Sequence, residues 1–279
     1  MLLIIQHTDP MRSPAEIAEL MLGYPLGPNQ QIAQTAFRQK LVESWGICEG
    51  QMVLEIGCGQ GDMTAVLADA VGESGQIVAV DLADRNYGAP VTLGDSMDHL
   101  MAGPLGGRLD VRFGFDVLEA VFNPGGFDAV VLAHCTWYFE SLDQLAAVLA
   151  KARPWTRRLC LSEWDMQPRS IDQLGHFLAV LVQGQVESFN KSSEANIRTP
   201  YTREKLREVL AGTGWQVERE ELVDASRLDD GKWEIDMALD ASSDAVPDCL
   251  RSFIEMQQQI LAEVRHTSLA LPSYAIVAT

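Results

Sequence analysis

The sequence predicts an α/β fold in which a parallel β-sheet carries helices on both faces. Three observations indicate this class. Short apolar segments alternate with amphipathic helical segments along the chain. One apolar segment, residues 127–133, contains almost no polar residue, as is typical of a strand that is covered on both faces. A glycine-rich turn over residues 57–61 joins the first strand of this alternation to the helix that follows it.

The first 45 residues predict a helical lead-in. Ser13, Pro14 and Glu16 occupy the N-cap, N1 and N3 positions of a helix, which is the pattern of a capping box. A turn rich in proline and glycine follows at residues 24–28, and a second helix is expected from about residue 29 to residue 44.

The segment from residue 50 to residue 165 predicts the core of the sheet. Helices are expected over residues 63–71 and after a capping box that begins at Ser141. Residues 84–107 are rich in glycine, proline and aspartate, with one short amphipathic stretch near residues 96–101. The expected strands are residues 52–56, 76–80, 111–115, 127–133 and 158–162.

The remaining residues predict a small helical cap and then the C-terminal half of the sheet. The cap, residues 166–200, contains a helix that begins at the capping box of Ser170 and runs to about residue 189. Because no long linker divides the chain, residues 1–279 are expected to form a single seven-stranded domain. In its last part, residues 201–279, we expect helices over 202–211 and 246–266, strands over 215–222 and 273–278, and an irregular acidic insertion over 224–247.

Composition narrows the class of partner. The chain has 279 residues, of which 47 % are hydrophobic and 22 % charged, as in ordinary globular proteins. Its net charge of -18 repels phosphate groups, so neither a nucleic acid nor an anionic membrane is expected as a partner. A small neutral or cationic molecule is a better match. The sequence leaves the oligomeric state open.

The cysteines and the apolar runs indicate a cytoplasmic protein without a metal site. None of the five cysteines forms a C-x-x-C pair, which disfavours a zinc ribbon or a redox dithiol, and the odd number favours reduced thiols. The apolar run at residues 1–5 is too short for a signal peptide and lacks a basic flank. No later apolar stretch approaches the roughly 20 residues that span a membrane.

Residues 53–64, VLEIGCGQGDMT, form the segment with the clearest chemistry. Gly57, Gly59 and Gly61 stand where the backbone must turn sharply and where a ligand can lie against it without an intervening Cβ. Asp81, at the tip of the next strand, is placed to bind ribose hydroxyls. The dinucleotide fingerprint G-x-G-x-x-G would need a third glycine where the chain has Asp62. Glu55, just before the loop, suits a ligand with an ammonium and a sulfonium better than a pyrophosphate.

These residues resemble the motifs of the class I S-adenosylmethionine-dependent methyltransferases. Residues 55–61 (EIGCGQG) and 79–82 (AVDL) resemble the first two motifs, and residues 114–116 (GFD) resemble the third. Residues 127–134 resemble the fourth-strand motif, and residues 201–215 resemble the penultimate helix–strand unit. The resemblance implies a Rossmann-like seven-stranded methyltransferase sheet, S-adenosyl-L-methionine as the cofactor and a methyl transfer reaction.

The resemblance also implies the roles of the donor-binding residues. The three loop glycines contact the methionine and ribose parts, and Glu55 supports the loop and the cation. Asp81 binds the ribose hydroxyls, and Leu82 lies against the adenine. The alternative for Glu55 is that it only orients the loop.

Three further positions complete the implied donor site. Asp116 accepts a hydrogen bond from the adenine amino group, Val117 packs nearby, and the backbone of Ala133 accepts from the methionine ammonium. The alternative for Asp116 is a simple helix N-cap. For Cys58, a small thiol that packs the loop is the preferred interpretation.

The acceptor side is expected beyond the carboxyl ends of the fourth and fifth strands. Trp137, Tyr138 and Trp164 follow these strands, and their rings suit a flat apolar acceptor and any positive charge that develops on it. The alternative is that the rings only pack the cap.

Several side chains are candidates for the catalytic role of proton acceptor. His134 is the best placed of these candidates, and Tyr24 and Glu140 are the next. An equal alternative for His134 is that it only shapes the donor pocket. Glu163 also follows the fifth strand, whereas His176 lies on an apolar helix and is more typical of a core histidine.

The predicted function is methyl transfer to a small, largely apolar and aromatic molecule. The layout is similar to that of the bacterial indole and pyrroloindole C3-methyltransferases of natural-product pathways. The alternatives are O- or N-methylation of another small metabolite, donor binding without catalysis, and a nicotinamide-dependent oxidoreductase.

Overall fold

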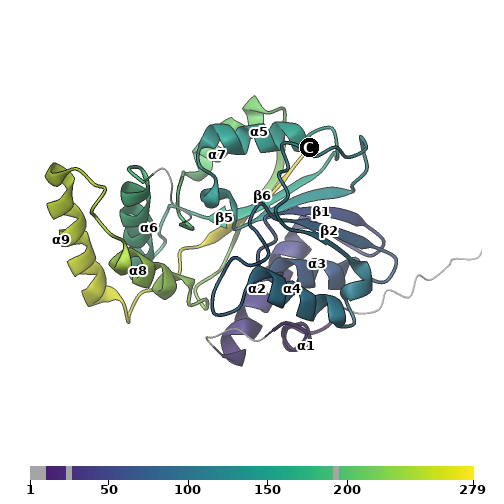
Figure 1. Ribbon diagram of the computed structural model, residues 1–279, viewed down its shortest axis with the longest axis horizontal. Helices are drawn as coiled ribbons and strands as arrows, with labels where there is room; N and C mark the ends of the chain where they lie inside the picture. The colour runs from purple at the N-terminus through teal and green to yellow at the C-terminus, as the bar shows by residue number, and fades with distance from the viewer. Residues whose placement is uncertain (1–10, 23–26, 191–194) are drawn as a thin grey trace, which may run out of the picture. The chain divides into compact units, whose positions relative to one another are not determined.

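The computed structural model describes residues 11–22, 27–190 and 195–279 (Figure 1). The chain divides into two compact units, and each is described by itself. The N-terminal unit comprises Met1–Val131 with Trp155–Arg157, and the C-terminal unit comprises Leu132–Pro154 with Arg158–Thr279.

Within the described residues, seven strands form one mixed sheet in the order β3-β2-β1-β4-β5-β7-β6, which confirms the predicted fold class. In the N-terminal unit, β1 pairs in parallel with β2 and with the start of β4, and β2 pairs in parallel with β3. In the C-terminal unit, β7 runs antiparallel to both β5 and β6, which departs from a purely parallel sheet. The strands are β1 (Met52–Ile56), β2 (Gln76–Val80), β3 (Leu109–Arg112), β4 (Ala129–Ala133), β5 (Leu159–Trp164), β6 (Val217–Val223) and β7 (Ser273–Ala278).

The helices of the N-terminal unit follow the predicted order. The capping box at Ser13 is confirmed: its hydroxyl accepts from Glu16 N, and the Glu16 carboxylate accepts from Ser13 N at 2.8 Å. The amphipathic stretch expected near residues 96–101 is a longer helix, because Thr92 caps it by accepting from Asp95 N at 3.0 Å. The helices are α1 (Pro14–Ala18), α2 (Pro28–Trp45), α3 (Asp62–Ala70) and α4 (Leu93–Ala102), with a 3-10 turn, η1 (Gly106–Arg108), before β3.

Two expected helix starts in the C-terminal unit have different outcomes. Ser141 caps α5 as predicted, with its hydroxyl accepting from Gln144 N at 3.2 Å. The capping box expected at Ser170 is wrong, because a 3-10 turn precedes α6 and the Gln173 side chain accepts from Arg169 N instead. The elements are η2 (Thr136–Tyr138), α5 (Leu142–Ala152), η3 (Ile171–Gln173), α6 (Leu174–Glu187), α7 (Arg203–Gly212), α8 (Asp230–Asp240) and α9 (Asp248–Val264).

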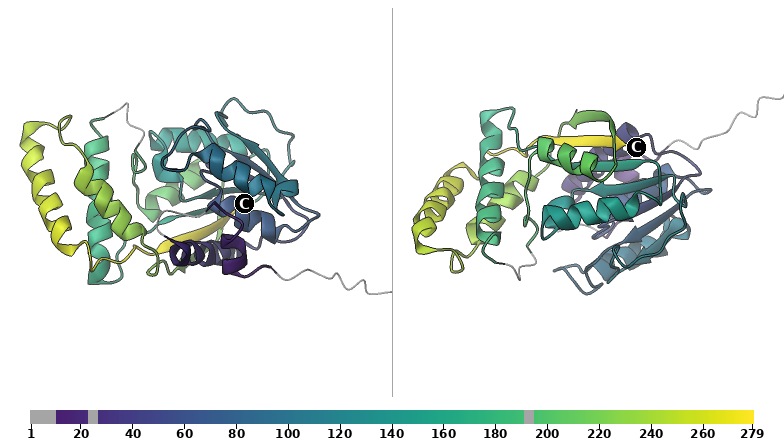
Figure 2. Two further views of the ribbon diagram at one scale, coloured as in Figure 1. Left: turned by 60° about the horizontal axis from the view of Figure 1, so that its bottom comes forward. Right: turned by 90° about the horizontal axis from the view of Figure 1, so that it is seen from above.

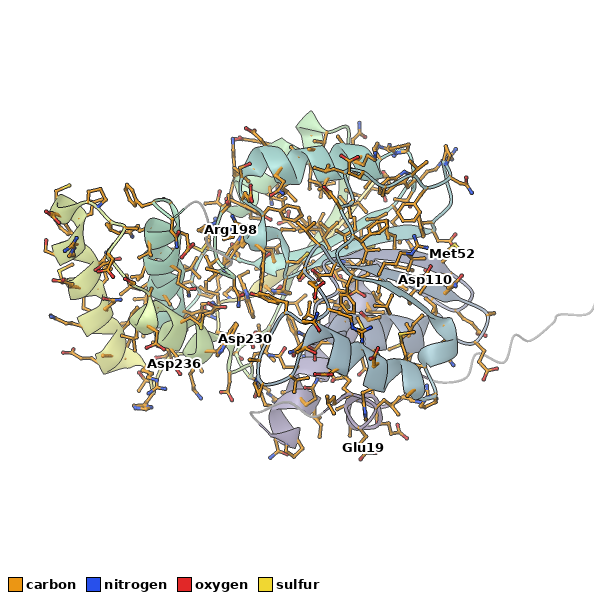
Figure 3. All side chains as sticks on the ribbon, viewed as in Figure 1. Glu19, Met52, Asp110, Arg198, Asp230 and Asp236 are labelled. Carbon is orange, nitrogen blue, oxygen red and sulfur yellow. The ribbon has the colours of Figure 1, made fainter. Side chains whose placement is uncertain are left out.

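Helices α6, α8 and α9 lie side by side in every view (Figures 1 and 2). The expectation of an irregular segment over residues 224–247 is wrong, because α8 lies within it. The acidic residues of this segment led to the expectation of a loop. Its buried apolar residues Ile235 and Ala238 are three positions apart, as on one face of a helix. Asp236, labelled in Figure 3, lies instead in an ion pair with Arg265 after α9. The buried core of this cluster consists of Ala179, Val182, Val186, Ile235, Ala238, Val246, Ile254 and Leu261.

None of the helices within residues 11–22, 27–190 and 195–279 has the length and apolar character needed to cross a membrane.

Candidate functional site

The glycine loop of the N-terminal unit has the backbone conformation that its sequence predicts. Gly57, Gly59 and Gly61 have φ angles of 78°, 52° and 91°, in the left-handed region that favours glycine. A Cβ placed on Gly59 would meet no atom within 4 Å, so open space lies in front of this residue. A Cβ on Gly61 would instead lie 2.8 Å from the Met97 sulfur, so this glycine also allows α4 to pack closely. Gly59 is therefore the position at which a ligand can approach the backbone.

Asp81, at the end of β2, holds this loop in place. Its Oδ2 accepts from Gly59 N at 2.8 Å, and its Oδ1 accepts from Ala83 N at 2.9 Å. Each carboxylate oxygen has a further lone pair that can accept from a ligand hydroxyl. The next side chain, Leu82, is 63 % exposed, although it is large and apolar. Together they present a polar and an apolar contact beside the loop, as a ribose and an adenine require.

Glu55 supports the loop from inside the unit. Its side chain is 1 % exposed, and its carboxyl accepts from the Thr64 hydroxyl of α3 at 2.6 Å. Burial raises the pKa of Glu55 to about 8, although the Thr64 hydrogen bond opposes this shift and Asp81 adds to it. This placement explains how Glu55 orients the loop; a direct contact with the ligand's cation stays a prediction.

Glu55→Gln is expected to change how stability depends on pH. With a pKa raised from 4.5 to about 8, the folded protein retains this proton over a pH range in which the unfolded chain has lost it. The free energy of unfolding should therefore fall as pH rises through this range, by about 1.4 kcal/mol per pH unit from this group. Glutamine has no such proton, so the variant should lose this contribution.

Urea denaturation between about pH 5 and 8 measures the effect. The exposed Glu73→Gln is the control for a lost carboxyl. Identical pH slopes for the wild type and Glu55→Gln would contradict this assignment.

Asp116 and Val117 follow β3. The Asp116 side chain is exposed, and its Oδ1 accepts from Leu118 N at 2.8 Å, which closes a turn two residues on. Val117 is buried. No helix begins directly after Asp116 in the described chain, so the helix N-cap alternative is wrong, and the adenine contact stays a prediction.

Gln31 on α2 is a residue that sequence analysis missed. Its Nε2 donates to Asp62 Oδ1 at 2.7 Å, directly after the glycine loop, and lies 3.2 Å from the Met21 sulfur. The N-terminal helices therefore help to fix the start of α3. No motif marks Gln31, because its partner is 31 positions away in the sequence.

In the C-terminal unit, β4 ends in a strained turn. His134 has a φ of 50° and is the non-glycine residue with positive φ in the described part of the chain. This conformation is uncommon for such a side chain and clusters at functional positions. The His134 N–H donates to Ser162 O of β5 at 2.9 Å, which fixes the direction of the chain after Ala133.

Both ring nitrogens of His134 have polar neighbours. Nε2 lies 2.8 Å from Ser162 Oγ and 3.1 Å from Ser273 Oγ, and Nδ1 lies 3.5 Å from Glu163 Oε1. The ring also meets the Trp164 ring edge-on, with centroids 4.5 Å apart. The side chain keeps 17 % of its surface exposed. The structure thus places His134 at a partly open position, with Nε2 hydrogen-bonded to two serines and the ring against Trp164.

The three aromatic residues predicted for the acceptor differ in exposure. Trp137, in η2, is 1 % exposed and meets the Tyr201 ring edge-on. Tyr138 is 44 % exposed. Trp164 is buried and lies between the rings of His134 and His176, with centroid distances of 4.5 Å and 5.1 Å. Burial alone would also fit the packing alternative for the two tryptophans.

The remaining predicted catalytic residues lie apart from this ring cluster or outside the described residues. Glu140 is exposed and lies 3.4 Å from Arg198 (labelled in Figure 3) in an ion pair. Tyr24 lies outside the described residues, so its role stays a prediction. Burial lowers the pKa of His176 to about 3, with His134 adding to the shift, and its Nδ1 accepts from Leu271 N. This agrees with a neutral core histidine.

Thr136, Tyr201 and Ser273 form the part of this site that sequence analysis missed. Glu163 accepts from Thr136 N at 3.1 Å and from the Thr136 hydroxyl at 2.7 Å, and that hydroxyl also bonds Tyr201. Burial raises the pKa of Tyr201 well above its ordinary value, so its hydroxyl remains protonated. Ser273 belongs to the last strand, and no local pattern connects it to residues more than a hundred positions earlier.

Comparison with known proteins identifies the family. A model of the protein-L-isoaspartate(D-aspartate) O-methyltransferase family matches residues 18–87, which include the glycine loop and Asp81. The crystal structure of a cyclopropane-fatty-acyl-phospholipid synthase-like protein from Lactobacillus casei ATCC 334 is 34 % identical in sequence, with a TM-score of 0.83 over 95 % of this chain and 98 % of that chain. The chain belongs to the family of this synthase-like protein and has the class I S-adenosylmethionine-dependent methyltransferase fold.

More distant structures share the methyltransferase's fold alone. The [4+2]-cyclase SpnF has a TM-score of 0.54 and 15 % identity, over 88 % of this chain and 80 % of that one. Geranyl diphosphate C-methyltransferase from Streptomyces coelicolor A3(2) has a TM-score of 0.52 and 14 % identity, over 88 % and 75 %. A search of curated proteins gives no match at the level of significance applied.

The residues of the N-terminal unit fit the cofactor of this methyltransferase, S-adenosyl-L-methionine. The open space before Gly59, the carboxylate of Asp81 and the exposed Leu82 meet the demands of its methionine, ribose and adenine parts. When bound, this cofactor supplies an electrophilic methyl group on a sulfonium.

Proposed function

We propose that this methyltransferase methylates a small, largely apolar and aromatic molecule, and that both units act as one methyltransferase domain. The ring cluster of the C-terminal unit is the observation that supports this class of acceptor. In it Trp164 lies between the rings of two histidines, and Trp137, which follows β4 in the sequence, is buried. Such rings favour a flat apolar ligand and a cation that forms on it.

The indole nitrogen of Trp137 adds a polar contact to this proposal. Among the residues that the structure describes, none accepts a hydrogen bond from Trp137 Nε1, although the atom is buried. An unpaired buried donor costs about 1–3 kcal/mol, and such groups commonly bond a water or a ligand. We infer that this N–H donates to a polar atom of the acceptor.

The protein's own contribution to the reaction is alignment and proton removal. A displacement at a sulfonium needs the nucleophile in line and water excluded, which rigid aromatic walls provide. His134 is the proposed group that receives a proton, because it is partly exposed and its ring is held in place.

The finer proposal is methylation of an indole or pyrroloindole carbon in a natural-product pathway, in a cytoplasmic setting. A carbon nucleophile of this kind attacks before it loses its proton, so it needs stacking more than a strong base. None of the five cysteines, all within the described residues, forms a disulfide, which supports a reducing compartment.

A second acceptor class, an unsaturated acyl chain, is favoured by two observations. The relative from Lactobacillus casei is named for acyl-chain chemistry. An apolar groove of about 550 Å³ between α6 and α9 adds apolar surface to the same unit, with Leu174, Phe177 and Ile260 in its wall. Aromatic and acyl-chain acceptors are both apolar and neutral, so either one agrees with the proposal of a small, largely apolar acceptor.

Trp137→Phe is expected to weaken acceptor binding without a loss of stability. The substitution keeps an aromatic ring but removes an N–H that has no acceptor among the described residues. With indole as the probe acceptor, the Michaelis constant should rise about threefold to tenfold, as expected for one hydrogen bond. Production of S-adenosylhomocysteine measures this constant.

Trp215→Phe is the matched control. Trp215 is equally buried, but its Nε1 donates to Leu149 O at 3.0 Å within the protein. This variant should lose thermal stability and keep the Michaelis constant. If Trp137→Phe loses stability and the Michaelis constant is unchanged, Trp137 is a packing residue.

A further inference from the structure

We propose that the outer face of helix α9 binds a second copy of this chain, so that the protein forms a two-fold symmetric dimer through its C-terminal unit. The face consists of residues that belong neither to the donor motifs nor to the ring cluster. The inference therefore does not depend on the identity of the acceptor.

Helix α9 has two apolar faces. Its inner face holds Ile254 and Leu261, which are buried in the core that α9 shares with α6 and α8. Its outer face, about 100° further round the helix, holds Phe253, Met256 and Ile260, which are 57 %, 48 % and 43 % exposed. The helix lies at the edge of this cluster in every view (Figures 1 and 2). A surface helix normally has one apolar face, so the outer one is expected to be covered by a partner.

The outer residues have the spacing of a helix–helix contact. They follow one another at intervals of four, three, four and four residues, which keeps them on one side of the helix. All five are uncharged, and they extend over nearly the whole length of α9. We call them the α9 seam: Cys249, Phe253, Met256, Ile260 and Val264.

The two halves of the α9 seam are complementary in shape. Near the C-terminal end of α6, the side chains of Gln185 and Gln257 meet at 3.4 Å, and the exposed Phe253 is one turn away from Gln257. Near the N-terminal end of α6, the two helices instead leave a groove of about 550 Å³, with Ile260 and Val264 of the seam in its wall. Pockets of this size hold drug-sized ligands, so the groove has room for a phenylalanine ring.

A second copy that is turned through 180° matches these halves. With the two α9 helices antiparallel and the axis between residues 256 and 257, Phe253 of each copy lies level with Ile260 of the other, beside its groove. Met256 of one copy then meets Met256 of the other near the axis. A two-fold interface needs one surface patch that fits itself, and a patch with a ring at one end and a groove at the other fulfils this condition.

Charge disfavours a membrane as the occupant. Helices that lie on membranes combine an apolar face with several lysines and arginines, whereas α9 has one arginine and three acidic residues: Asp248, Arg251, Glu255 and Glu263. The net charge of -18 adds repulsion from anionic lipid. An acyl chain in the groove would leave Phe253 uncovered at the other end of the seam. A second copy covers both ends without burying a charged residue of the seam.

The wild type should dimerise without any substrate. Sedimentation velocity of the full chain over an about hundredfold range of concentration should show a species of twice the chain's mass, which dissociates on dilution. Cys249 of the seam is an exposed free thiol in the single chain, so its reaction with N-ethylmaleimide should slow as the dimer forms. Cys48, another exposed free thiol, is the internal control and should react at a constant rate. A single chain at every concentration, or a constant rate at Cys249, overturns the proposal.

Phe253→Glu should separate the two copies. The two-fold axis places the new charge in an apolar contact twice per dimer, so the dissociation constant should rise about 10²-fold or more. Ala262→Glu is the matched control: Ala262 is exposed on the same helix, but nine positions from Phe253 and thus on the opposite face. This variant should remain dimeric. Equal dissociation constants for the wild type and Phe253→Glu overturn the assignment to the seam, and if Phe253→Glu fails to fold, the wild-type rate at Cys249 decides.

Lipid probes test the rival occupants. Phosphatidylcholine vesicles and methyl oleate are each added to the wild type at concentrations at which the dimer is expected. A dimer that does not sediment with the vesicles supports the proposal. A single chain that sediments with the vesicles, or whose Cys249 is protected from N-ethylmaleimide only by methyl oleate, has a lipid on this face, and either result overturns the proposal.

Discussion

Gly59→Val is expected to abolish binding of S-adenosylmethionine while the fold persists. The glycine has a φ of 52°, and a Cβ there would point into open space rather than into the protein. A valine side chain would therefore occupy the volume that the ligand needs, at a backbone conformation that β-branched residues avoid. We expect the dissociation constant to rise more than about 10²-fold, which is a loss of about 2.8 kcal/mol. Isothermal titration calorimetry measures it, and circular dichroism checks the fold.

Gly125→Val separates exclusion of the ligand from backbone strain. Gly125 also has a positive φ, 64°, and a Cβ there would also meet nothing within 4 Å. However, Gly125 precedes the first residue of β4, whereas Gly59 follows the last residue of β1. This variant should bear a similar strain and bind the donor normally. If both variants bind normally, the loop at Gly59 is only a turn.

Asp81→Ala is expected to have the second largest effect on donor binding. On the assignment of Asp81 to the ribose, the variant would lose two charge-assisted hydrogen bonds to its hydroxyls, each worth about 1.5–3 kcal/mol. It also removes the acceptor that holds Gly59 N at 2.8 Å, so the loop itself loses support. We expect the affinity for S-adenosylmethionine to fall about 10²-fold or more in the calorimeter.

Asp84→Ala is its matched control. Like Asp81, Asp84 accepts from the backbone N–H two residues later, that of Asn86, at 2.9 Å. Unlike Asp81, it makes no bond to the glycine loop, because its side-chain bonds go to Asn86 in the same turn. It should leave donor affinity near the wild-type value. Equal losses in the two variants would mean that Asp81 acts only by shaping the local turn.

The conformation of the glycine loop could be predicted from the sequence because its signals are local. Gly57, Gly59 and Gly61 lie within five residues, and their positive φ angles are a property of the turn itself. The buried strands on either side are short apolar runs, which their composition marks directly. For this reason the sheet and the donor loop agree closely with expectation.

The acceptor half depends on contacts between distant positions. The partners of His134 come from β5 and from β7, 28 and 139 positions away. No spacing rule connects such residues, so Ser273 and Tyr201 were missed, and Glu163 was considered only as a base. The helix α8 was missed for another reason: its acidic residues alternate with its apolar ones, so the segment was taken for an acidic loop.

The most direct test of methyl transfer to a neutral apolar acceptor is production of S-adenosylhomocysteine by the full chain. The donor is supplied with indole, with methyl oleate or with an isoaspartyl peptide, the last an acidic acceptor of the kind named by the matching family model. We predict turnover with indole that disappears in Gly59→Val, and no turnover with the acidic peptide, since the protein has a net charge of -18. Turnover with the acidic peptide alone, or tight donor binding without turnover on any acceptor, would contradict the account.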